Sequence, residues 1–281
     1  HVLLGENGAG KATLIGILSG QSAPDEGTIR IDGAARRIAS PKQALALGIG
    51  TVFQHSMLVP TLSVVDNLAL GGRWWQRTDR AQLAARLRQT ASSFGLAVEP
   101  EALAGELSLG ERQQVEIARA LMRGGRVLIL DEATSMLTPK GIADLGALMG
   151  RLTRKGIAVV FISHKLAEAF AFGDRITVLR RGRKVGEIAP DRLKRLDEKA
   201  ATAEIVRLMF GDGRSDGGAA VERTPRRPPP QSKPVLVVHG LAVEAAGHRI
   251  EAIDLEVRGG EILGIAGIDG NGQRELAEAL A

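Results

Sequence analysis

The 281-residue sequence predicts an α/β fold in which a mainly parallel sheet is covered by helices on both faces. Two observations lead to this prediction. Short apolar segments at 2–4, 127–130 and 158–162 have the length and uniform hydrophobicity of strands that are buried on both faces. Segments with apolar residues at helical spacing lie between them, as the crossovers between parallel strands require.

The individual elements are assigned from the spacing of their apolar residues. We expect strands at 2–4, 27–32, 49–53, 127–130 and 158–162, helices at 11–19 and 142–152, a largely helical region from 63 to about 107, and an amphipathic helix around 115–122. The helix at 11–19 would bury Leu14, Ile15 and Leu18 on one face, and the helix at 142–152 would bury Ile142 and three leucines.

A linker is expected at 213–234, where the sequence is rich in glycine, charge and proline and cannot form a core. Strand-like sequence restarts at 235–238. The division is therefore a first domain at 1–212, a linker, and the beginning of a second domain at 235–281. Because the sequence starts with His1 inside a strand, we expect it to be a fragment.

Bulk composition excludes several classes of protein. The chain has no cysteine, which excludes disulfides and thiolate zinc sites, and no apolar run reaches the ~20 residues of a membrane span. The net charge of +5 could suggest nucleic acid, but the charges are scattered and tyrosine is absent. We therefore expect no nucleic-acid partner.

The segment GENGAGKAT at 5–13 follows the first strand and matches the phosphate-binding pattern G-x-x-x-x-G-K-[ST] except at one position. Glycines leave the backbone N–H groups free to surround phosphate oxygens, and the lysine supplies positive charge toward the β- and γ-phosphates. The alanine replaces the hydroxyl that would hold Mg²⁺. The candidate nucleotide-binding residues are Gly5, Glu6, Asn7, Gly8, Ala9, Gly10, Lys11, Ala12 and Thr13. We call this segment the P-loop.

Asp131 and Glu132 directly follow the strand at 127–130, at the edge of the sheet where ligands bind in open α/β folds. Asp131 would hold Mg²⁺ through water, and Glu132 would act as general base for the attacking water. An ordinary pair of acids facing solvent is the alternative. His164 and Gln54 also follow strands, and neither is informative alone.

The segment LSLGE at 107–111 opens the helix around 115–122. Ser108 and Glu111 are spaced as a capping box, which by itself explains both residues. In the alternative interpretation this helix N-terminus binds a phosphate. The candidate residues are Ser108, Leu109, Gly110 and Glu111.

A second glycine-rich loop, GIDGNGQREL at 267–276, repeats the pattern of the P-loop. Gly267, Gly270 and Gly272 align with the glycines of the P-loop, and the apolar segment 262–265 aligns with its strand. Gln273 replaces the lysine. The repeat indicates a degenerate second phosphate-binding loop, with an ordinary strand-to-helix turn as the alternative.

Taken in order, the P-loop, Gln54, LSLGE, LILDE at 128–132 and His164 resemble the ATP-binding-cassette ATPases over residues 1 to about 212. The resemblance implies a RecA-like P-loop NTPase core, a small antiparallel β region and a helical subdomain at about 63–125. It also implies ATP and Mg²⁺, with Gln54 near the metal and the water, and His164 at the γ-phosphate. The LSLGE residues would contact ATP held by the opposite cassette.

The segments 48–71, 107–121 and 128–141 look more specifically like the first cassette of tandem-cassette importers of simple sugars or nucleosides. That resemblance implies two membrane permeases, an extracytoplasmic solute-binding protein acting indirectly, a second cassette in the same polypeptide, and a place on the cytoplasmic face of the membrane. The site built on the P-loop would be the hydrolytic one. Two alternatives stay open: a soluble cassette ATPase acting on nucleic acid, and a nucleotide-binding module whose hydrolysis is impaired by Ala12.

Overall fold

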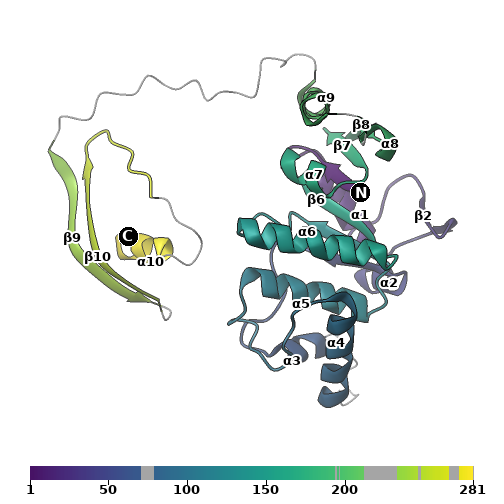
Figure 1. Cartoon of the computed structure of the whole chain (residues 1–281), viewed down its shortest axis with the longest axis horizontal. Helices are drawn as coiled ribbons and strands as arrows, with labels where there is room; N and C mark the ends of the chain where they lie inside the picture. Colours follow the sequence, from purple (N-terminus) through teal and green to yellow (C-terminus); the bar gives the residue numbers. More distant parts are fainter. Residues whose placement is uncertain are drawn as a thin grey trace. The chain divides into compact units, whose positions relative to one another are not determined.

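The computed structural model describes residues 1–70, 79–193, 195, 197–211, 233–245, 248–265 and 272–280. Contacts divide the chain into two compact units, His1–Ser215 and Asp216–Ala281, and each is described by itself (Figure 1). The predicted linker at 213–234 lies almost wholly outside the described residues, so this domain division stays a prediction.

A six-stranded sheet forms the centre of the first unit. Its strands lie in the order β4-β5-β6-β1-β7-β8, and all neighbours are parallel except the antiparallel pair β7–β8. A separate two-stranded antiparallel sheet joins β2 to β3. The strands are β1 (Val2–Leu4), β2 (Ile29–Ile31), β3 (Ala34–Arg36), β4 (Ile49–Val52), β5 (Val127–Asp131), β6 (Ala158–Ser163), β7 (Ile176–Arg180) and β8 (Arg183–Ile188). The mainly parallel sheet and the small antiparallel region are as predicted.

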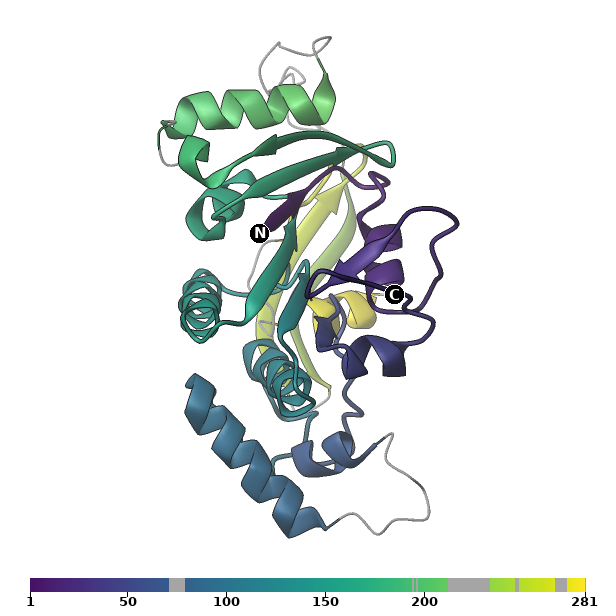
Figure 2. The same cartoon turned by 90° about the vertical axis from the view of Figure 1, so that its right-hand side faces the viewer.

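Helices cover both faces of this sheet, because successive strand residues point to opposite sides. Leu3 packs with α1 and α2 in one core, whereas Val2 and Leu4 pack in the other core with α5, α6, α7 and α9. Figure 2 shows α1 and α2 on one side of the sheet and α5 and α6 on the other. The helices of this unit are α1 (Lys11–Leu18), α2 (Pro41–Ala46), α3 (Val64–Ala69), α4 (Arg80–Phe94), α5 (Leu109–Met122), α6 (Pro139–Arg154), α7 (Leu166–Phe172), α8 (Pro190–Leu193) and α9 (Glu198–Phe210).

Two burial predictions need correction. Leu14 is 37% exposed, whereas Ile15 is buried as predicted and Leu18 is half-buried. Ile142 is only half-buried, while Met149 joins the leucines in the core of α6. Periodicity selects the apolar face of a helix, but the width of the covered stripe depends on the neighbouring elements.

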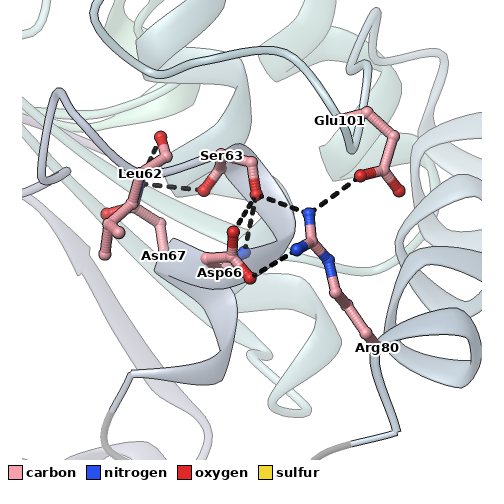
Figure 3. A network of polar contacts seen from close by, with 6 residues as sticks. All are labelled: Leu62, Ser63, Asp66, Asn67, Arg80 and Glu101. Atoms are coloured by element: carbon pink, nitrogen blue, oxygen red, sulfur yellow. Dashed lines mark hydrogen bonds and ion pairs between the residues drawn. The ribbon is translucent and has the colours of Figure 1, made fainter.

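The predicted helical region contains α3, α4 and α5, with α4 packed against both others. A polar network joins α3 to α4 (Figure 3). Ser63 caps α3 by accepting a hydrogen bond from the Asp66 amide at 3.2 Å. The Arg80 guanidinium lies 3.2 Å from the Asp66 carboxylate and donates to Glu101 at 2.9 Å. One arginine at the start of α4 thus fixes the N-terminus of α3.

The second unit contains an antiparallel pair, β9 (Pro234–Ala245) and β10 (His248–Arg258), with α10 (Gln273–Leu280) packed on it. The expected strand at 262–265 is wrong. These residues have no strand structure, and Ile262 is 97% exposed. β1, the strand to which this segment was compared, is paired on both sides by β6 and β7. Among the described residues of the second unit, no strand pairs with 262–265 on either side.

None of the described helices is long and apolar enough to cross a membrane.

Candidate functional site

The P-loop connects the end of β1 to the start of α1 and folds back on itself. Gly8 and Gly10 have φ values of 80° and 99°, in the left-handed region that favours glycine. Lys11 is 7% exposed, and its ammonium donates to the carbonyls of Gly5 at 2.6 Å and of Glu6 at 3.1 Å. The lysine therefore closes the loop into a ring at the N-terminus of α1, where backbone amides favour an anion.

The β7–β8 hairpin braces the outside of this loop. The Gly182 amide donates to the Ala9 carbonyl at 3.0 Å. A cavity of about 870 Å³ lies between the loop residues 6–9 and the hairpin, and three arginines of the hairpin line it, namely Arg180, Arg181 and Arg183. Nothing near these arginines in the chain singled them out, because the hairpin lies about 175 residues beyond the P-loop.

Sheet register brings the predicted catalytic residues to one edge. Because β6 lies between β5 and β1, Asp131 pairs with Ile162 and Leu4 pairs with Ser163. The residues that follow these strands are Glu132, His164 and Gly5, so all three lie at the carboxyl edge of the same parallel sheet. This is the edge at which open α/β sheets bind ligands.

Glu132 and His164 face one another there. The Nδ1 atom of His164 lies 3.5 Å from the Oε1 atom of Glu132, whose side chain is 17% exposed. Glu132 has a φ of 45°, a costly left-handed conformation for a residue with a side chain, and its amide donates to Ile162 at 3.1 Å. The turn thus holds the carboxylate against the imidazole.

The carboxyl of Asp131 has a pKa above its ordinary value. Burial is the main cause, and the neighbouring charge of Glu132 adds to it, whereas Lys11 acts in the opposite direction. The influence of Lys11 on Asp131 means that the P-loop and the acidic pair share one electrostatic environment.

The cassette fold implies Mg²⁺, and the donor atoms at this edge fit it in kind. The Asp131 carboxylate and the Gln54 amide have the hard oxygen atoms that Mg²⁺ prefers, and the remaining ligands would come from phosphate and water. Ala12 and Thr13 are both exposed in the first turn of α1, and Ala12 supplies no oxygen. Among the described residues no group of three or more His, Cys, Asp or Glu side chains forms a metal site.

Gln54 is exposed just beyond β4 and lines a small cleft together with Glu132. The same cleft is lined by Leu109 and Gln113 from the first turns of α5, and the Gln113 amide donates to the Ala133 carbonyl at 3.0 Å. The structure therefore places Gln54, Glu132 and the start of α5 side by side.

Glu116 was missed by sequence reasoning. It is 3% exposed on α5, and its Oε1 atom accepts hydrogen bonds from the Met57 amide at 2.7 Å and the Ser56 hydroxyl at 3.2 Å. These residues immediately follow Gln54 and His55. A carboxylate inside an otherwise apolar helix face was the available signal, and it ties the Gln54 segment to α5.

The capping box predicted at Ser108 is confirmed. The Glu111 amide donates to the Ser108 hydroxyl at 3.3 Å, while the Glu111 carboxylate accepts from the Ser108 amide at 2.8 Å and from its hydroxyl at 2.7 Å. These two bonds from Ser108 hold the pKa of Glu111 below its usual 4.5. Contact of Ser108–Glu111 with a phosphate stays a prediction.

Replacement of Ser108 by alanine is expected to lower the free energy of unfolding by about 1 kcal/mol at pH 7. Because the folded-state pKa of Glu111 is lowered, its contribution is present above pH 4.5 and is lost as the pH falls through the folded value. The difference in the free energy of unfolding between Ser108→Ala and the wild type should therefore be smaller at pH 3 than at pH 7. Urea unfolding at both pH values measures this.

Ser40→Ala is the matched control. Ser40 caps α2 by accepting from the Gln43 backbone amide at 3.2 Å, and the uncharged side-chain oxygen of Gln43 accepts from the Ala39 backbone amide at 2.9 Å. The loss of unfolding free energy in Ser40→Ala should be similar at the two pH values. Equal pH dependence in both variants would contradict the role assigned to Glu111.

The second glycine-rich loop is only partly described. Gly267 and Gly270 lie outside the described residues. Gly272 has a φ of 92°, and α10 begins at Gln273, as α1 begins at Lys11 after Gly10. A Cβ atom at Gly272 would lie 2.2 Å from Ile250, so packing as well as conformation requires glycine. The degenerate character of this loop stays a prediction.

The sheet order, the P-loop at the end of β1 and the acids at the end of β5 define a P-loop NTPase cassette. Residues 1–135 match the family described as ABC transporter, and the chain contains a domain of that family. For these residues the predicted family is confirmed, and the sheet order with its covering helices confirms the predicted fold class.

Among the solved structures it resembles are an ATP-binding cassette of an ABC transporter in its ADP conformation and cbiO1 from Clostridium perfringens, part of an ABC transporter complex. The first has a TM-score of 0.63 at 24% identity and covers 74% of this chain and 85% of its own. The second has a TM-score of 0.59 at 26% identity and covers 74% and 83%.

Among curated proteins the chain is similar to the nucleoside import ATP-binding protein NupA of Lactococcus lactis, at 40% identity over 100% of this chain and 54% of the relative. It is also 42% identical to a ribose import ATP-binding protein, RbsA 1, of Rubrobacter xylanophilus, and 44% identical to RbsA 1 of Burkholderia thailandensis. Both alignments cover 100% of this chain and 53% of the relative. The chain thus spans about half the length of these relatives.

Proposed function

We propose that the chain is the ATP-binding and ATP-hydrolysing part of an ABC importer for simple sugars or nucleosides. The observation that carries the proposal is the meeting of Lys11, Asp131, Glu132 and His164 at one edge of the sheet. The importer branch is supported by the nucleoside and ribose import proteins to which the whole chain is similar. Residues 1–212 would form the first cassette, 213–234 a linker, and 235–281 the start of the second.

Hydrolysis would proceed by attack of water on the γ-phosphorus, with the bond to the β–γ bridging oxygen breaking so that ADP and phosphate leave. Glu132 would accept the proton from that water, with His164 holding the carboxylate and contacting the γ-phosphate. Gln54 would orient the water from the cleft it shares with Glu132. Lys11 and the P-loop amides would hold the β- and γ-phosphates. Asp131 and Gln54 would hold Mg²⁺, which supplies positive charge to the phosphate oxygens.

The partners belong to the same proposal. Two membrane permeases would bind the cassettes on the cytoplasmic face of the membrane, and an extracytoplasmic solute-binding protein would act indirectly. Ser108, Leu109, Gly110 and Glu111 would contact ATP held by the second cassette of the same polypeptide, against the degenerate loop at Gly267–Gln273. Co-purification of the full-length protein with two permeases tests this assignment, and salt-dependent nucleic-acid binding without permeases would overturn it.

Ala12 favours a second candidate function, a nucleotide-binding module that hydrolyses slowly. Restoring the hydroxyl by Ala12→Ser should raise Mg²⁺-dependent kcat/KM of the full-length protein by about tenfold or more. A tenfold increase requires the recovered oxygen ligand to stabilise the transition state by ~1.4 kcal/mol. Steady-state phosphate release across a Mg²⁺ titration measures the effect.

Thr13→Ser is the control, since it keeps a hydroxyl at the neighbouring position, which points about 100° away around the helix. It should leave the Mg²⁺ dependence unchanged. If Ala12→Ser produces no increase, position 12 does not limit hydrolysis.

A further inference from the structure

A buried carboxylate lies behind the Glu132–His164 pair. Glu168, on α7, is 5% exposed and belongs to none of the motifs that define the cassette. Its Oε2 atom accepts hydrogen bonds from the Ser163 hydroxyl at 2.6 Å and the Thr134 hydroxyl at 2.7 Å. The Lys165 ammonium lies 3.1 Å from its Oε1 atom. Both hydroxyl donors are themselves 2% exposed.

These contacts join the two loops that carry the pair. Thr134 comes two residues after Glu132, and Ser163 directly precedes His164. The Ser163 hydroxyl also accepts from the Lys165 amide at 3.0 Å, which closes the turn around His164. One carboxylate oxygen therefore holds a fixed point on each loop, within two residues of the atoms that approach to 3.5 Å.

The group is suited to this role as an anion. Burial alone would raise the pKa of Glu168, but the hydrogen bonds from Ser163 and Thr134 and the ion pair with Lys165 outweigh it, and the pKa is lowered. An ionised carboxylate accepts from several donors at once and gives charge-assisted, shorter hydrogen bonds.

We propose that Glu168 is a positioning residue that sets the geometry of Glu132 against His164 by binding Thr134 and Ser163. It touches neither side chain and acts only through the two loops. The catalytic consequence rests on the function proposed above, whereas the structural link does not.

The test compares Glu168→Ala and Glu168→Gln in the full-length protein by ATP turnover and by hydrogen exchange. Glu168→Ala should lower kcat by about tenfold or more while KM for ATP changes less than about twofold, because the P-loop is untouched. Glu168→Gln keeps an oxygen that can accept from both hydroxyls but loses the charge that strengthens these bonds, so its kcat should lie between those of Glu168→Ala and the wild type. Exchange of the Glu132 and Lys165 amides should quicken in Glu168→Ala, while amides in the middle of β5 and β6 stay protected.

Two controls separate positioning from simple loss of stability. Glu204→Ala removes another shielded carboxylate, which lies on α9 and pairs with Arg192 of α8 at 2.8 Å. It should leave kcat and the exchange of the Glu132 and Lys165 amides unchanged. In a His164→Ala background Glu168→Ala should lower kcat by a much smaller factor than in the wild type, because both changes disturb the same Glu132–His164 pair.

Unchanged kcat in a folded Glu168→Ala or Glu168→Gln protein, or full additivity with His164→Ala, would overturn the catalytic part. Should Glu168→Ala fail to fold, Glu168→Gln carries the comparison alone. A wild-type protein without ATP turnover would refute the proposed function. Hydrogen exchange of the Glu132 and Lys165 amides would still test whether Glu168 fixes the two loops, and unchanged exchange in Glu168→Ala would refute that link.

Discussion

Glu132→Gln is expected to lower kcat for ATP hydrolysis by about 10²–10⁴-fold, the usual contribution of a general base. The amide has nearly the same shape and can still contact His164, which lies 3.5 Å from the carboxylate, but it cannot take a proton from water. ATP binding should persist, because the P-loop contacts are unaffected. Single-turnover phosphate release and equilibrium ATP binding, measured on the full-length protein, separate the two effects.

Glu99→Gln is the matched control for the loss of one negative charge. Glu99 is exposed and faces Arg88 at 3.8 Å on the surface, so its replacement should leave kcat unchanged. A Glu132→Gln protein that hydrolyses ATP at the wild-type rate would show that the base is another group, and the mechanism proposed here would fail.

Gly5→Ala is expected to weaken ATP binding by at least about tenfold and to lower the free energy of unfolding by about 1–3 kcal/mol, the usual cost of overpacking. A Cβ atom at position 5 would lie 2.7 Å from the Leu179 carbonyl oxygen and 2.8 Å from the Ala9 Cβ atom. Neither neighbour is the end of a flexible side chain. The loop or β7 must therefore move, and the ring closed by Lys11 onto Gly5 moves with it.

Gly150→Ala is the control for adding a methyl group without crowding. Gly150 lies within α6, and its Cβ would meet only the flexible end of Arg154 at 3.4 Å. Alanine should be neutral there or stabilising by up to about 1 kcal/mol, since it is the better helix former. If calorimetry gives Gly5→Ala the same ATP affinity as the wild type, the loop can relieve the close contacts of the added Cβ without disturbing the nucleotide site.

Local sequence signals identified the core strands β1, β4, β5 and β6 and the longer helices up to α6, but assigned no element over 164–212. The uniform apolar runs became β1, β5 and β6, and the Ser108–Glu111 spacing became a capping box. Such signals depend on residues within a few positions of one another, so they survive without knowledge of the fold. The failure at 262–265 has the opposite cause, because a parallel strand forms only where neighbouring strands supply its hydrogen bonds.

The candidate site divides in the same way. Lys11, Asp131 and the glycines of the P-loop stand in recognisable patterns beside their strands. The closeness of Glu132 and His164 is not visible in such a pattern, because it comes from the pairing of Asp131 with Ile162 in adjacent strands. Glu168 reads as an ordinary helix residue until its hydroxyl donors from two other segments are seen.

From its residues alone this chain could be assigned its cassette class, its P-loop and the unusual Ala12, since all three are properties of short contiguous segments. The tertiary structure decided which distant side chains lie together: Glu132 with His164, Glu116 with the segment after Gln54, and Glu168 with the loops that carry Glu132 and His164. The physical reason is that strand order and register bring together residues far apart in the chain, and no local spacing encodes that order.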